Sequence, residues 1–573
     1  TIAAAMGLMA ATLSPGGIDL WDGVILGCFT LTLPWTAIGF WNGLIGLVLL
    51  RRGPSGSTGA QRRAAAPNGA RTAILSCIRN EDVNAVGRTL DRMIRGILEA
   101  GAGERFAVWI LSDSDWAECI AAEEGLVQDL TGLWAGRIEL GYRRRPANTG
   151  YKAGNIRDFL TAQGARFDYA LVLDADSLMA PDTILDLVGR MDADPGLGLL
   201  QTLVVGLPSA SAFARPFQFG MRLGMRSYTL GSAWWQGDCG PYWGHNALIR
   251  VAPFRKHCAL PQLPGDPPLG GWVLSHDQVE AALLRRGGYA VRVLPVEDGS
   301  WEENPPTLLE FIRRDLRWCQ GNLQYLRLLR LPGLRPVSRV QLLLAMLLFL
   351  SSPAWVLLMT LGALRVGLAE PGAALLNPVP GSLLFTLILT MVFTPKLATL
   401  TDLLLRGQGR RAFGGTPRVL ASAVTEVAFS TLLAPIMAIA HTVFMAGLPF
   451  GRALAWGPQR RAAHGVGWGL ALRRLWPQTL VGLAALLWLS ATAGPLAMWL
   501  SPFFVGALIA VPLAVITASP ALGLLLARLG LWRIPEETEP LPLIRSLDLP
   551  ALAAIPTPKG HRLGRMDPAE TAD

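Results

Sequence analysis

The separation of charged from apolar residues constrains the fold of this chain more than any other feature of its sequence. Charged residues crowd into residues 51–340, whereas residues 23–50 form an uncharged apolar run and further apolar runs fill the chain after residue 340. A helix of about 20 apolar residues crosses the roughly 30 Å of hydrocarbon in a bilayer. Only 16% of the residues are charged, against about 25% in soluble domains. The sequence therefore predicts a soluble domain inserted between groups of transmembrane helices.

Arginine in the loops sets the expected orientation of these helices. Arg51 and Arg52 follow the first long apolar run, and Arg406 and Arg410 follow a later one. Arginine and lysine collect in cytosolic loops, so we expect these loops and the soluble domain in the cytosol. Membrane lipids are then expected partners. The net charge of +9 is explained by these loops, and we expect no nucleic-acid partner.

The apolar runs and linkers divide the chain into several expected segments. They are N-terminal transmembrane helices at 1–52, a linker at 53–70, a cytosolic domain at 71–304, an amphipathic interface helix at 305–335, C-terminal transmembrane helices at 336–530 and a poorly ordered cytosolic tail at 531–573. Pro435 interrupts residues 419–449. One crossing there would place the next basic loop outside, and two crossings need about 40 residues. We therefore expect a broken or re-entrant segment at 419–449, followed by a helical hairpin at 478–500 and 502–527.

Residues 71–304 repeat a pattern of short apolar run, polar turn and amphipathic helix. The apolar runs are Thr72–Ile78, Phe106–Leu111 and Tyr169–Leu173, and a first amphipathic helix is expected at residues 83–100. Alternation of strands and helices is typical of an α/β domain with a mostly parallel sheet. In such sheets, ligands bind beyond the carboxyl ends of the strands, which is where the polar turns lie. We therefore expect the carboxylates of these turns to converge on one ligand.

Two carboxylates, Asp174 and Asp176, directly follow the third predicted strand. Paired carboxylates at a strand end can bind a divalent cation and, through it, a diphosphate, and hard oxygen ligands suit Mg²⁺ or Mn²⁺. An acidic turn without a ligand is the alternative for these two residues taken alone. Their place at the third strand end of an α/β unit favours the metal site.

Further polar side chains near the same strand ends are candidates for nucleotide contacts. Asp113 ends the second strand, where its carboxylate can accept a hydrogen bond from a nucleobase or form an Asx turn. Asn80 and Glu81 lie in the turn after the first strand. Lys152 and Asn155 precede the third strand, and a lysine beside small residues can contact a diphosphate. A solvated loop is the alternative for the lysine.

Two later segments carry candidate groups for catalysis and for binding of an acceptor. Asp277 lies at the start of a helix predicted over Gln278–Arg286, where it can cap the helix or act as a general base. The second segment consists of Trp243, Gly244, His245 and Asn246. Its aromatic ring can stack on a sugar and its amide can bind hydroxyl groups, although a buried aromatic turn is the alternative.

An amphipathic helix rich in leucine and arginine is predicted at Leu308–Leu331, directly before a transmembrane run. Arg314, Arg317 and Trp318 share one face of this helix, because residues three and four apart are neighbours. Arginine can neutralise a pyrophosphate leaving group, and the indole can stack on a sugar ring. A helix that only binds the membrane surface, with its arginines on anionic lipid, is the alternative.

The order of these motifs resembles the processive family 2 glycosyltransferases, which include cellulose, hyaluronan and chitin synthases. Longer strings, among them LVLDADSLM, YWGHNALIRV and RWCQGNL, narrow the resemblance to the glucosyltransferases of osmoregulated periplasmic glucan synthesis, over about residues 71–530. The resemblance implies a GT-A-like α/β nucleotide-sugar transferase domain with a mostly parallel sheet. This domain would be inserted in an α-helical polytopic membrane domain of the bacterial inner membrane.

The resemblance also implies a reaction. The donor would be UDP-glucose, the acceptor a growing glucan chain, and the product a β-1,2-linked glucan backbone delivered across the inner membrane. A synthase of another β-glucan or polysaccharide, cellulose-like or hyaluronan-like, is the alternative, and a transporter with a regulatory nucleotide domain is a second. Acyl carrier protein is a partner by resemblance only, and a second copy of the chain is a further candidate partner.

The family motifs give roles to individual residues by resemblance. Asp113 would bind the uridine side of the donor, and Asp174 and Asp176 would hold the diphosphate and its metal. Asp277 takes the place of the catalytic base, in Ser-His-Asp where the family has Thr-Glu-Asp.

The membrane-proximal motif of the family has the pattern QxxRW. Here Arg314, Arg317 and Trp318 take its place, with Arg314 in the position of the glutamine. The segment Trp243–Asn246 matches the acceptor side of the family's site, where Trp318 would also contact the acceptor.

Overall fold

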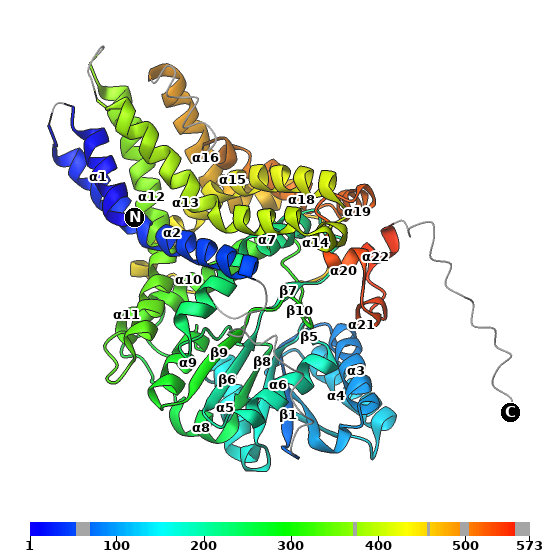
Figure 1. Ribbon diagram of the computed structural model, residues 1–573. Coiled ribbons are helices and arrows are strands. Elements are labelled where there is room, and N and C mark those ends of the chain that lie inside the picture. The colour runs from blue at the N-terminus through cyan, green and yellow to red at the C-terminus, as the bar shows by residue number, and fades with distance from the viewer. Residues whose placement is uncertain (16, 53–68, 371–374, 455–458, 493–503, 556–573) are drawn as a thin grey trace.

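The computed structural model describes residues 1–15, 17–52, 69–370, 375–454, 459–492 and 504–555. Long helices gather in an upper layer, and an α/β domain lies below them (Figure 1). The chain enters the α/β domain after α2 (Leu20–Arg52) and returns to the helix layer through α10 (Leu308–Leu323). Most of the linker expected at 53–70 lies outside the described residues.

In the described part of the chain, the α/β domain is built on a seven-stranded sheet of order β3-β2-β1-β4-β8-β6-β9. The strands are β1 (Thr72–Ile78), β2 (Phe106–Ser112), β3 (Glu139–Arg144), β4 (Tyr169–Asp174), β6 (Leu197–Thr202), β8 (Ala247–Arg250) and β9 (Ala290–Leu294). Strand β8 runs antiparallel to β4 and β6, and the other neighbouring pairs are parallel. The prediction of a mostly parallel sheet is confirmed, and the three predicted strands are β1, β2 and β4.

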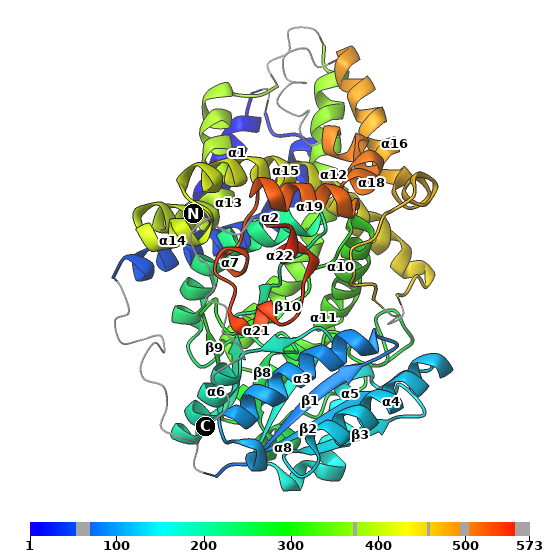
Figure 2. The same ribbon diagram turned by 90° about the vertical axis from the view of Figure 1, so that its right-hand side faces the viewer.

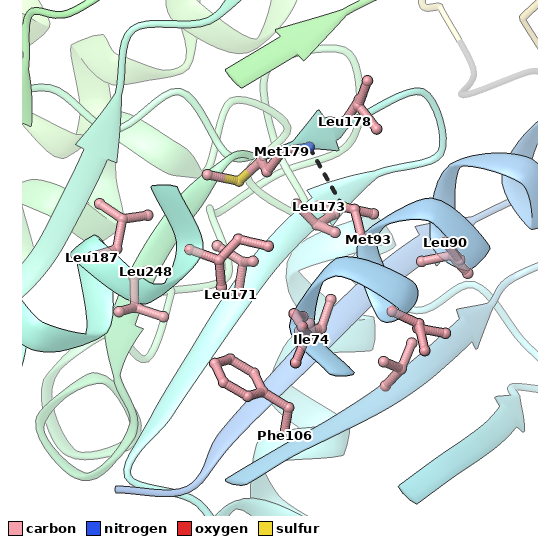
Figure 3. Close-up of a cluster of buried hydrophobic side chains, with 14 of the residues drawn as sticks. Ile74, Leu90, Met93, Phe106, Leu171, Leu173, Leu178, Met179, Leu187 and Leu248 are labelled. Atoms are coloured by element: carbon pink, nitrogen blue, oxygen red, sulfur yellow. Dashed lines mark hydrogen bonds between the residues drawn. The ribbon is translucent and has the colours of Figure 1, made fainter. Parts of the chain in front are cut away.

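Two apolar cores cover the two faces of this sheet. Ile74 packs into one core and the next residue, Leu75, into the other, as the two-residue period of a strand requires. The first face is covered by α3 (Val83–Glu99), α4 (Ala117–Trp134) and α6 (Pro181–Ala193), and the second by α5 (Tyr151–Gln163), α8 (Val251–His257) and α9 (Asp277–Arg286). Figure 3 shows the first core, where the backbone N–H of Met179 donates to the Met93 sulfur at 3.4 Å.

A small second sheet lies between the central sheet and the helix layer (Figure 1). It has the order β5-β10-β7. Its strands are β5 (Leu178–Met179), β10 (Ser300–Glu302) and β7 (Val205–Gly206). Since β5 follows the paired aspartates and β10 precedes α10, this sheet joins the predicted metal site to the interface helix.

Among the described residues, five helices are long and apolar enough to cross a membrane by length and composition. They are α2, α12 (Pro336–Leu368), α13 (Pro378–Leu405), α15 (Thr416–Gly447) and α16 (Trp468–Thr492). The pair α18 (Ala510–Thr517) and α19 (Pro520–Leu529) would make a sixth span, but its two helices are bent by 72°. The chain is therefore a membrane protein. The turn of the hairpin expected at 478–527 falls on residues 493–503, outside the described residues.

Helix α7 (Ala214–Gln236) is a feature that the sequence did not predict. Its 23 residues lie within the segment 71–304, yet it packs against α2, α13 and α15. A Cβ added to Gly46 of α2 would lie 1.9 Å from the carbonyl oxygen of Ser227, and Gly231 makes a similar close approach to α2. Glycine at these positions lets the two helices touch. Residues 71–304 are thus not a purely α/β segment, because α7 belongs to the helix layer.

The expected break at 419–449 is wrong. Helix α15 is continuous and runs through Pro435. It begins beside α7, and near its end His441 Nε2 lies 2.6 Å from Asp315 Oδ2 of α10. Because both ends of α15 stay beside helices that adjoin the α/β domain, the basic loops before and after it can lie on one side without a break.

The segment after residue 530 is also different from the expectation of a poorly ordered tail. Residues 531–555 form α20 (Pro535–Thr538), α21 (Pro542–Arg545) and α22 (Pro550–Ala554), which descend from the helix layer onto the α/β domain (Figures 1 and 2). Ile544 is fully buried in the core that includes α3. The packing has a clear cause, since this segment supplies apolar side chains to that core and carboxylates to buried arginines. Residues 556–573 lie outside the described residues.

Candidate active site

The polar turns after β1, β2 and β4 meet at one cleft. The cleft is lined by Cys77, Ile78, Arg79, Glu81, Asp113, Asn148, Tyr151, Lys152, Asp174, Ala175, Gln459 and Arg461. These residues come from three strand ends, from the start of α5 and from the segment between α15 and α16. Glu81, Asp113 and Asp174 therefore share one cleft, and their convergence on one ligand stays a prediction.

Asp174 lies at the centre of a compact charge network. The Lys152 ammonium donates to Asp174 Oδ1 and, at 2.7 Å, to the carbonyl oxygen of Gly244. His245 Nδ1 lies 3.7 Å from Asp174 Oδ2. Burial raises the pKa of Asp174, but Lys152 and His245 outweigh that effect and hold the pKa well below its usual range. This carboxylate is therefore ionised at neutral pH.

Asp176 has a different environment although it is only two residues away. Its Oδ2 pairs with Arg461 and accepts a hydrogen bond from the backbone N–H of Glu303 at 3.3 Å. Burial raises its pKa to about 7, with Arg461 opposing and the Glu302 carboxylate adding to the rise. The two aspartates thus differ in how readily they ionise.

Arg461 is a site residue that the sequence analysis missed. It also contacts Glu81, with Nε–Oε2 and Nη2–Oε1 distances of 3.2 and 3.3 Å. Arg461 and its neighbour Arg460 belong to the basic loop after residues 419–449, and the sequence predicts no more for this loop than its place in the cytosol. The pair of adjacent arginines between two apolar runs is the sequence signal that could have identified Arg461.

The paired aspartates could hold a divalent cation. Their oxygens are hard ligands of the kind that Mg²⁺ and Mn²⁺ prefer. Lys152 pairs with Oδ1 of Asp174 and Arg461 with Oδ2 of Asp176, so a cation would bind through the other oxygen of each carboxylate. In the described part of the chain, no three or more His, Cys, Asp or Glu side chains group closely enough to hold a metal by themselves. The residues fit a cation whose remaining ligands come from a diphosphate and water.

His245 and Glu302 form an ion pair that adjoins Asp174. His245 Nε2 lies 2.9 Å from Glu302 Oε2. Burial lowers the pKa of His245, but the Asp174 and Glu302 carboxylates raise it to about 9. The imidazole is therefore charged at neutral pH, so it supports the paired aspartates more directly than it could bind a sugar acceptor.

Asp277 opens α9 and lies beside the same network. A Cβ built on Gly244, whose φ is +84°, would lie 3.5 Å from Cβ of Asp277. Since the Gly244 carbonyl accepts from Lys152, Asp277 and Asp174 lie on either side of one backbone turn. The preceding His276 turns inward to Glu280 at 2.8 Å. The Asp277 side chain is half-buried.

The predicted helix face is present on α10. The Arg314 guanidinium stacks on the Trp318 ring at 4.8 Å. Burial lowers the pKa of Arg314, while the carboxylate of Glu302 counteracts this. Burial also lowers the pKa of Arg317, to about 10. Trp318 is 45% exposed, so its ring remains available beside the two arginines.

These arginines belong to a strongly basic recess next to the paired aspartates. The recess is lined by Glu303, Asn304, Pro305, Pro306, Glu310, Arg313, Arg314, Arg317, Gln459, Arg460 and Arg461. Five arginines against two glutamates give it a positive charge. Such a recess suits phosphate groups, which arginine binds with two parallel hydrogen bonds.

Several predicted contact residues are engaged inside the protein. Asn80 bonds to Asp115, with Nδ2 donating at 2.6 Å. Asn155 is buried, and its side chain accepts from Arg143. Asn246 is fully buried and donates to Ser300 Oγ at 2.9 Å. These amides hold the loops of the site, and the structure does not bring them to the cleft surface.

Asp113 remains at the cleft, but it is paired. Arg145 donates to both of its oxygens, at 2.7 and 2.9 Å. Gln201 plays a comparable part for the segment Trp243–Asn246, because it accepts from the Trp243 N–H and donates to the His245 carbonyl, both at 2.9 Å. Neither Arg145 nor Gln201 stood out in the sequence, since each partner lies far from it along the chain.

The fold and the site define a class of enzyme. Residues 74–258 match the family model described as glycosyl transferase family 2, and residues 169–397 match the model for glycosyl transferase family group 2. A mostly parallel α/β sheet with paired aspartates at a strand end is thus the GT-A-like transferase domain of a family 2 glycosyltransferase.

Full-length relatives narrow the class. Glucans biosynthesis glucosyltransferase H of Xanthomonas campestris pv. campestris (strain B100) is 35% identical over 572 residues, which cover 97% of this chain and 88% of the relative. The protein of the same name from Bradyrhizobium diazoefficiens is 37% identical over 92% of this chain and 71% of the relative. The chain belongs to the glucans biosynthesis glucosyltransferase H family.

A solved structure was also compared. The mannosyltransferase PcManGT from Pyrobaculum calidifontis, in complex with GDP-Man and Mn²⁺, matches with a TM-score of 0.42 and 17% identity, over 66% of this chain and 99% of that chain.

Proposed function

We propose that this glucan-synthesising glycosyltransferase transfers glucose from UDP-glucose to the end of a growing glucan and so builds the β-1,2-linked backbone of osmoregulated periplasmic glucans. The name and the coverage of the relatives support a glucan product. The apolar helices support a multi-pass protein, which we place in the bacterial inner membrane with its catalytic domain in the cytosol. The product is then exported across that membrane.

The donor is expected to lie in the cleft between β1, β2 and β4. Its diphosphate would lie near Asp174 and Asp176, which hold the divalent cation, Mg²⁺ or Mn²⁺. When bound, this cation neutralises charge on the departing UDP. Lys152, Arg314 and Arg461 add positive charge around the same place.

Asp277 acts as the general base. Its carboxylate takes the proton of the acceptor's 2-hydroxyl group, and that oxygen attacks C1 of the donor glucose while the bond from C1 to the UDP oxygen breaks. A single displacement inverts the α donor to a β product. The observation that carries the proposal is the place of Asp277, across the Gly244 turn from Asp174 and Lys152.

The position of α10 supports a route for the product into the helix layer. Trp318 is exposed on this helix, and Asp315 of the same helix bonds His441 of α15, which in turn contacts Ser352 Oγ of α12 at 2.9 Å. Active site and membrane helices are therefore one connected unit. A glucan that stacks on Trp318 is already beside those helices.

The direct test is transfer of labelled glucose from UDP-glucose by the purified chain in lipid, with Mg²⁺ or Mn²⁺ and with acyl carrier protein present or absent. Methylation analysis of the product should give 2-linked glucose. A 4-linked or hyaluronan-like product would replace the proposal with a different polysaccharide synthase. Absence of transfer from any nucleotide sugar would favour the transporter alternative.

A further inference from the structure

Two consecutive glutamates of α20 are buried at the junction of the helix layer and the α/β domain. Glu536 Oε1 accepts a hydrogen bond from Nε1 of Trp301, in β10, at 3.0 Å and pairs with Arg222 of α7. Both Glu536 and Trp301 are less than 7% exposed, at 6% and 1%. A carboxylate buried in this way is costly unless it is paired and hydrogen-bonded. Apolar side chains would fill the same space at less cost, so burial alone does not explain this contact.

Strand β10 connects this carboxylate to the active site. Successive side chains of a strand point to opposite faces, so Trp301 faces Glu536 while Ser300 and Glu302 face the other way. Ser300 Oγ accepts from Asn246, at 2.9 Å. Glu302 holds His245, at 2.9 Å. Glu536 therefore contacts one face of β10, and the opposite face of the strand contacts His245 and Asn246.

The same strand reaches both predicted metal ligands. His245, held by Glu302, lies 3.7 Å from Asp174. The backbone N–H of Glu303, the residue after β10, donates to Asp176 at 3.3 Å. A small shift of β10 would therefore move the partners of both aspartates together.

The other end of the connection is anchored in the helix layer. Glu537 pairs with Arg215 of α7 through both oxygens, at 2.5 and 3.0 Å, and neither side chain is exposed. Arg222, the partner of Glu536, also lies 3.9 Å from Glu297 in the loop before β10. Helix α7 packs on α2 and α13. Strand β10 is therefore connected, through Glu536 and Arg222 of α7, to helices of the membrane layer.

We propose that Glu536 is a positioning residue for the cation site, which it holds in place through Trp301 and strand β10. This inference rests on the proposed cation at Asp174 and Asp176. It assigns the C-terminal segment a part in the chemistry although the segment touches neither substrate nor metal.

The test compares E536A, E536Q and the matched control E539Q in the full-length chain in lipid nanodiscs. Glu539 is exposed on the same segment. Mn²⁺ binding is measured by electron paramagnetic resonance with UDP present, which supplies the diphosphate oxygens, and without any sugar donor. Loss of a group that orients metal ligands typically weakens metal affinity by about 10-fold or more. We expect E536A to weaken Mn²⁺ binding by about 10-fold and E536Q, which keeps an acceptor oxygen for Trp301, by less, while E539Q matches the unsubstituted protein.

A second measurement separates positioning from general stability. Hydrogen exchange of the β10 amides should become faster in E536A, while the β1 and β2 amides keep their rates. If folded E536A binds Mn²⁺ as tightly as the unsubstituted protein, or if exchange rises equally in all strands, the inference is overturned. If the unsubstituted protein binds no Mn²⁺, the inference fails with its cation site. Failure to transfer glucose from UDP-glucose would instead overturn the proposed donor. The effect of E536A on Mn²⁺ binding could still be measured in that case.

Discussion

The sheet side and the membrane side of the active site are held by different interactions. On the sheet side, Asp174 ends a strand enclosed between two apolar cores. On the membrane side, α7 and the C-terminal segment are joined by buried ion pairs such as Arg215–Glu537. Apolar cores tolerate exchanges of similar volume, whereas a buried pair that loses one partner leaves an uncompensated charge. Substitutions should therefore fail in different ways on the two sides.

The largest effect is expected on the sheet side, where the chemistry lies. Asp277→Asn keeps the shape of the side chain but removes the proposed base. General base catalysis contributes about 10²- to 10⁴-fold, so we expect kcat for glucose transfer to fall by about 10³-fold while UDP affinity stays the same. Initial rates with labelled UDP-glucose and calorimetric titration with UDP measure the two quantities.

Asp266→Asn is the matched control for this substitution, because Asp266 is an exposed aspartate in the loop before α9. It should leave both rate and affinity unchanged. Glucan synthesis by Asp277→Asn at more than a tenth of the normal rate would show that another group takes the proton.

The next effect is expected on the membrane side and concerns stability. Glu537→Ala leaves the fully buried Arg215 guanidinium without its bidentate partner. Breaking such a pair costs about 3 to 5 kcal/mol in the free energy of unfolding. Chemical unfolding followed by tryptophan fluorescence measures the change, and Glu539→Ala, at an exposed position, should change it by less than about 0.5 kcal/mol. Equal effects of both variants would mean that the C-terminal segment does not join the two sides.

A third effect lies where the two sides meet, at the pair of His245 and Glu302. The pKa of His245 is about 9 in the folded protein, against about 6.5 in an unfolded chain. The stabilisation is therefore complete below about pH 6.5 and is lost as the pH rises through about 9. The shift is equivalent to about 3 kcal/mol.

Unfolding measured between pH 6 and pH 10 checks this sign. The unsubstituted chain should lose up to about 3 kcal/mol more across this range than His245→Gln. His464→Gln is the control, since Nδ1 of this histidine lies 2.9 Å from a backbone carbonyl oxygen, that of Ala462. Parallel pH profiles for the unsubstituted chain and His245→Gln would contradict the ion pair.

The same contrast explains what the sequence could predict. Asp174 and Asp176 follow an apolar run directly, and a parallel sheet brings strand ends together whatever the long-range order of the strands. The place of Asp277 at the start of α9 and the shared face of Arg314 and Trp318 are likewise local, since each depends on residues within one helix. Local patterns of this kind can be predicted from the sequence because they follow the periods of strands and helices.

The membrane side could not be predicted, because its contacts join residues far apart in the chain. Arg461 meets Asp176 only after the chain has passed through the helix layer. Glu536 and Glu537 lie in a proline-rich stretch whose composition is typical of a poorly ordered tail, and only their pairing with α7 orders it. The break expected in α15 came from an assumption that every apolar run crosses the membrane upright. Under that assumption, an unbroken helix at 419–449 would have placed the next basic loop outside.

The smallest effect concerns the close contact of α2 with α7, which fastens the α/β domain to the helix layer. A Cβ on Gly46 would lie 1.9 Å from the Ser227 carbonyl oxygen, whereas one on Gly39 of the same helix meets nothing within 4 Å. Overpacking of this kind costs about 1 to 3 kcal/mol, while alanine in place of an unhindered helix glycine gains up to about 1 kcal/mol. We therefore expect Gly46→Ala to lower the unfolding midpoint and Gly39→Ala to raise it slightly. If both variants move the midpoint in the same direction, then α2 and α7 do not touch as closely as Gly46 and Ser227 indicate, and the ion pairs of the C-terminal segment must carry more of the connection between the two sides.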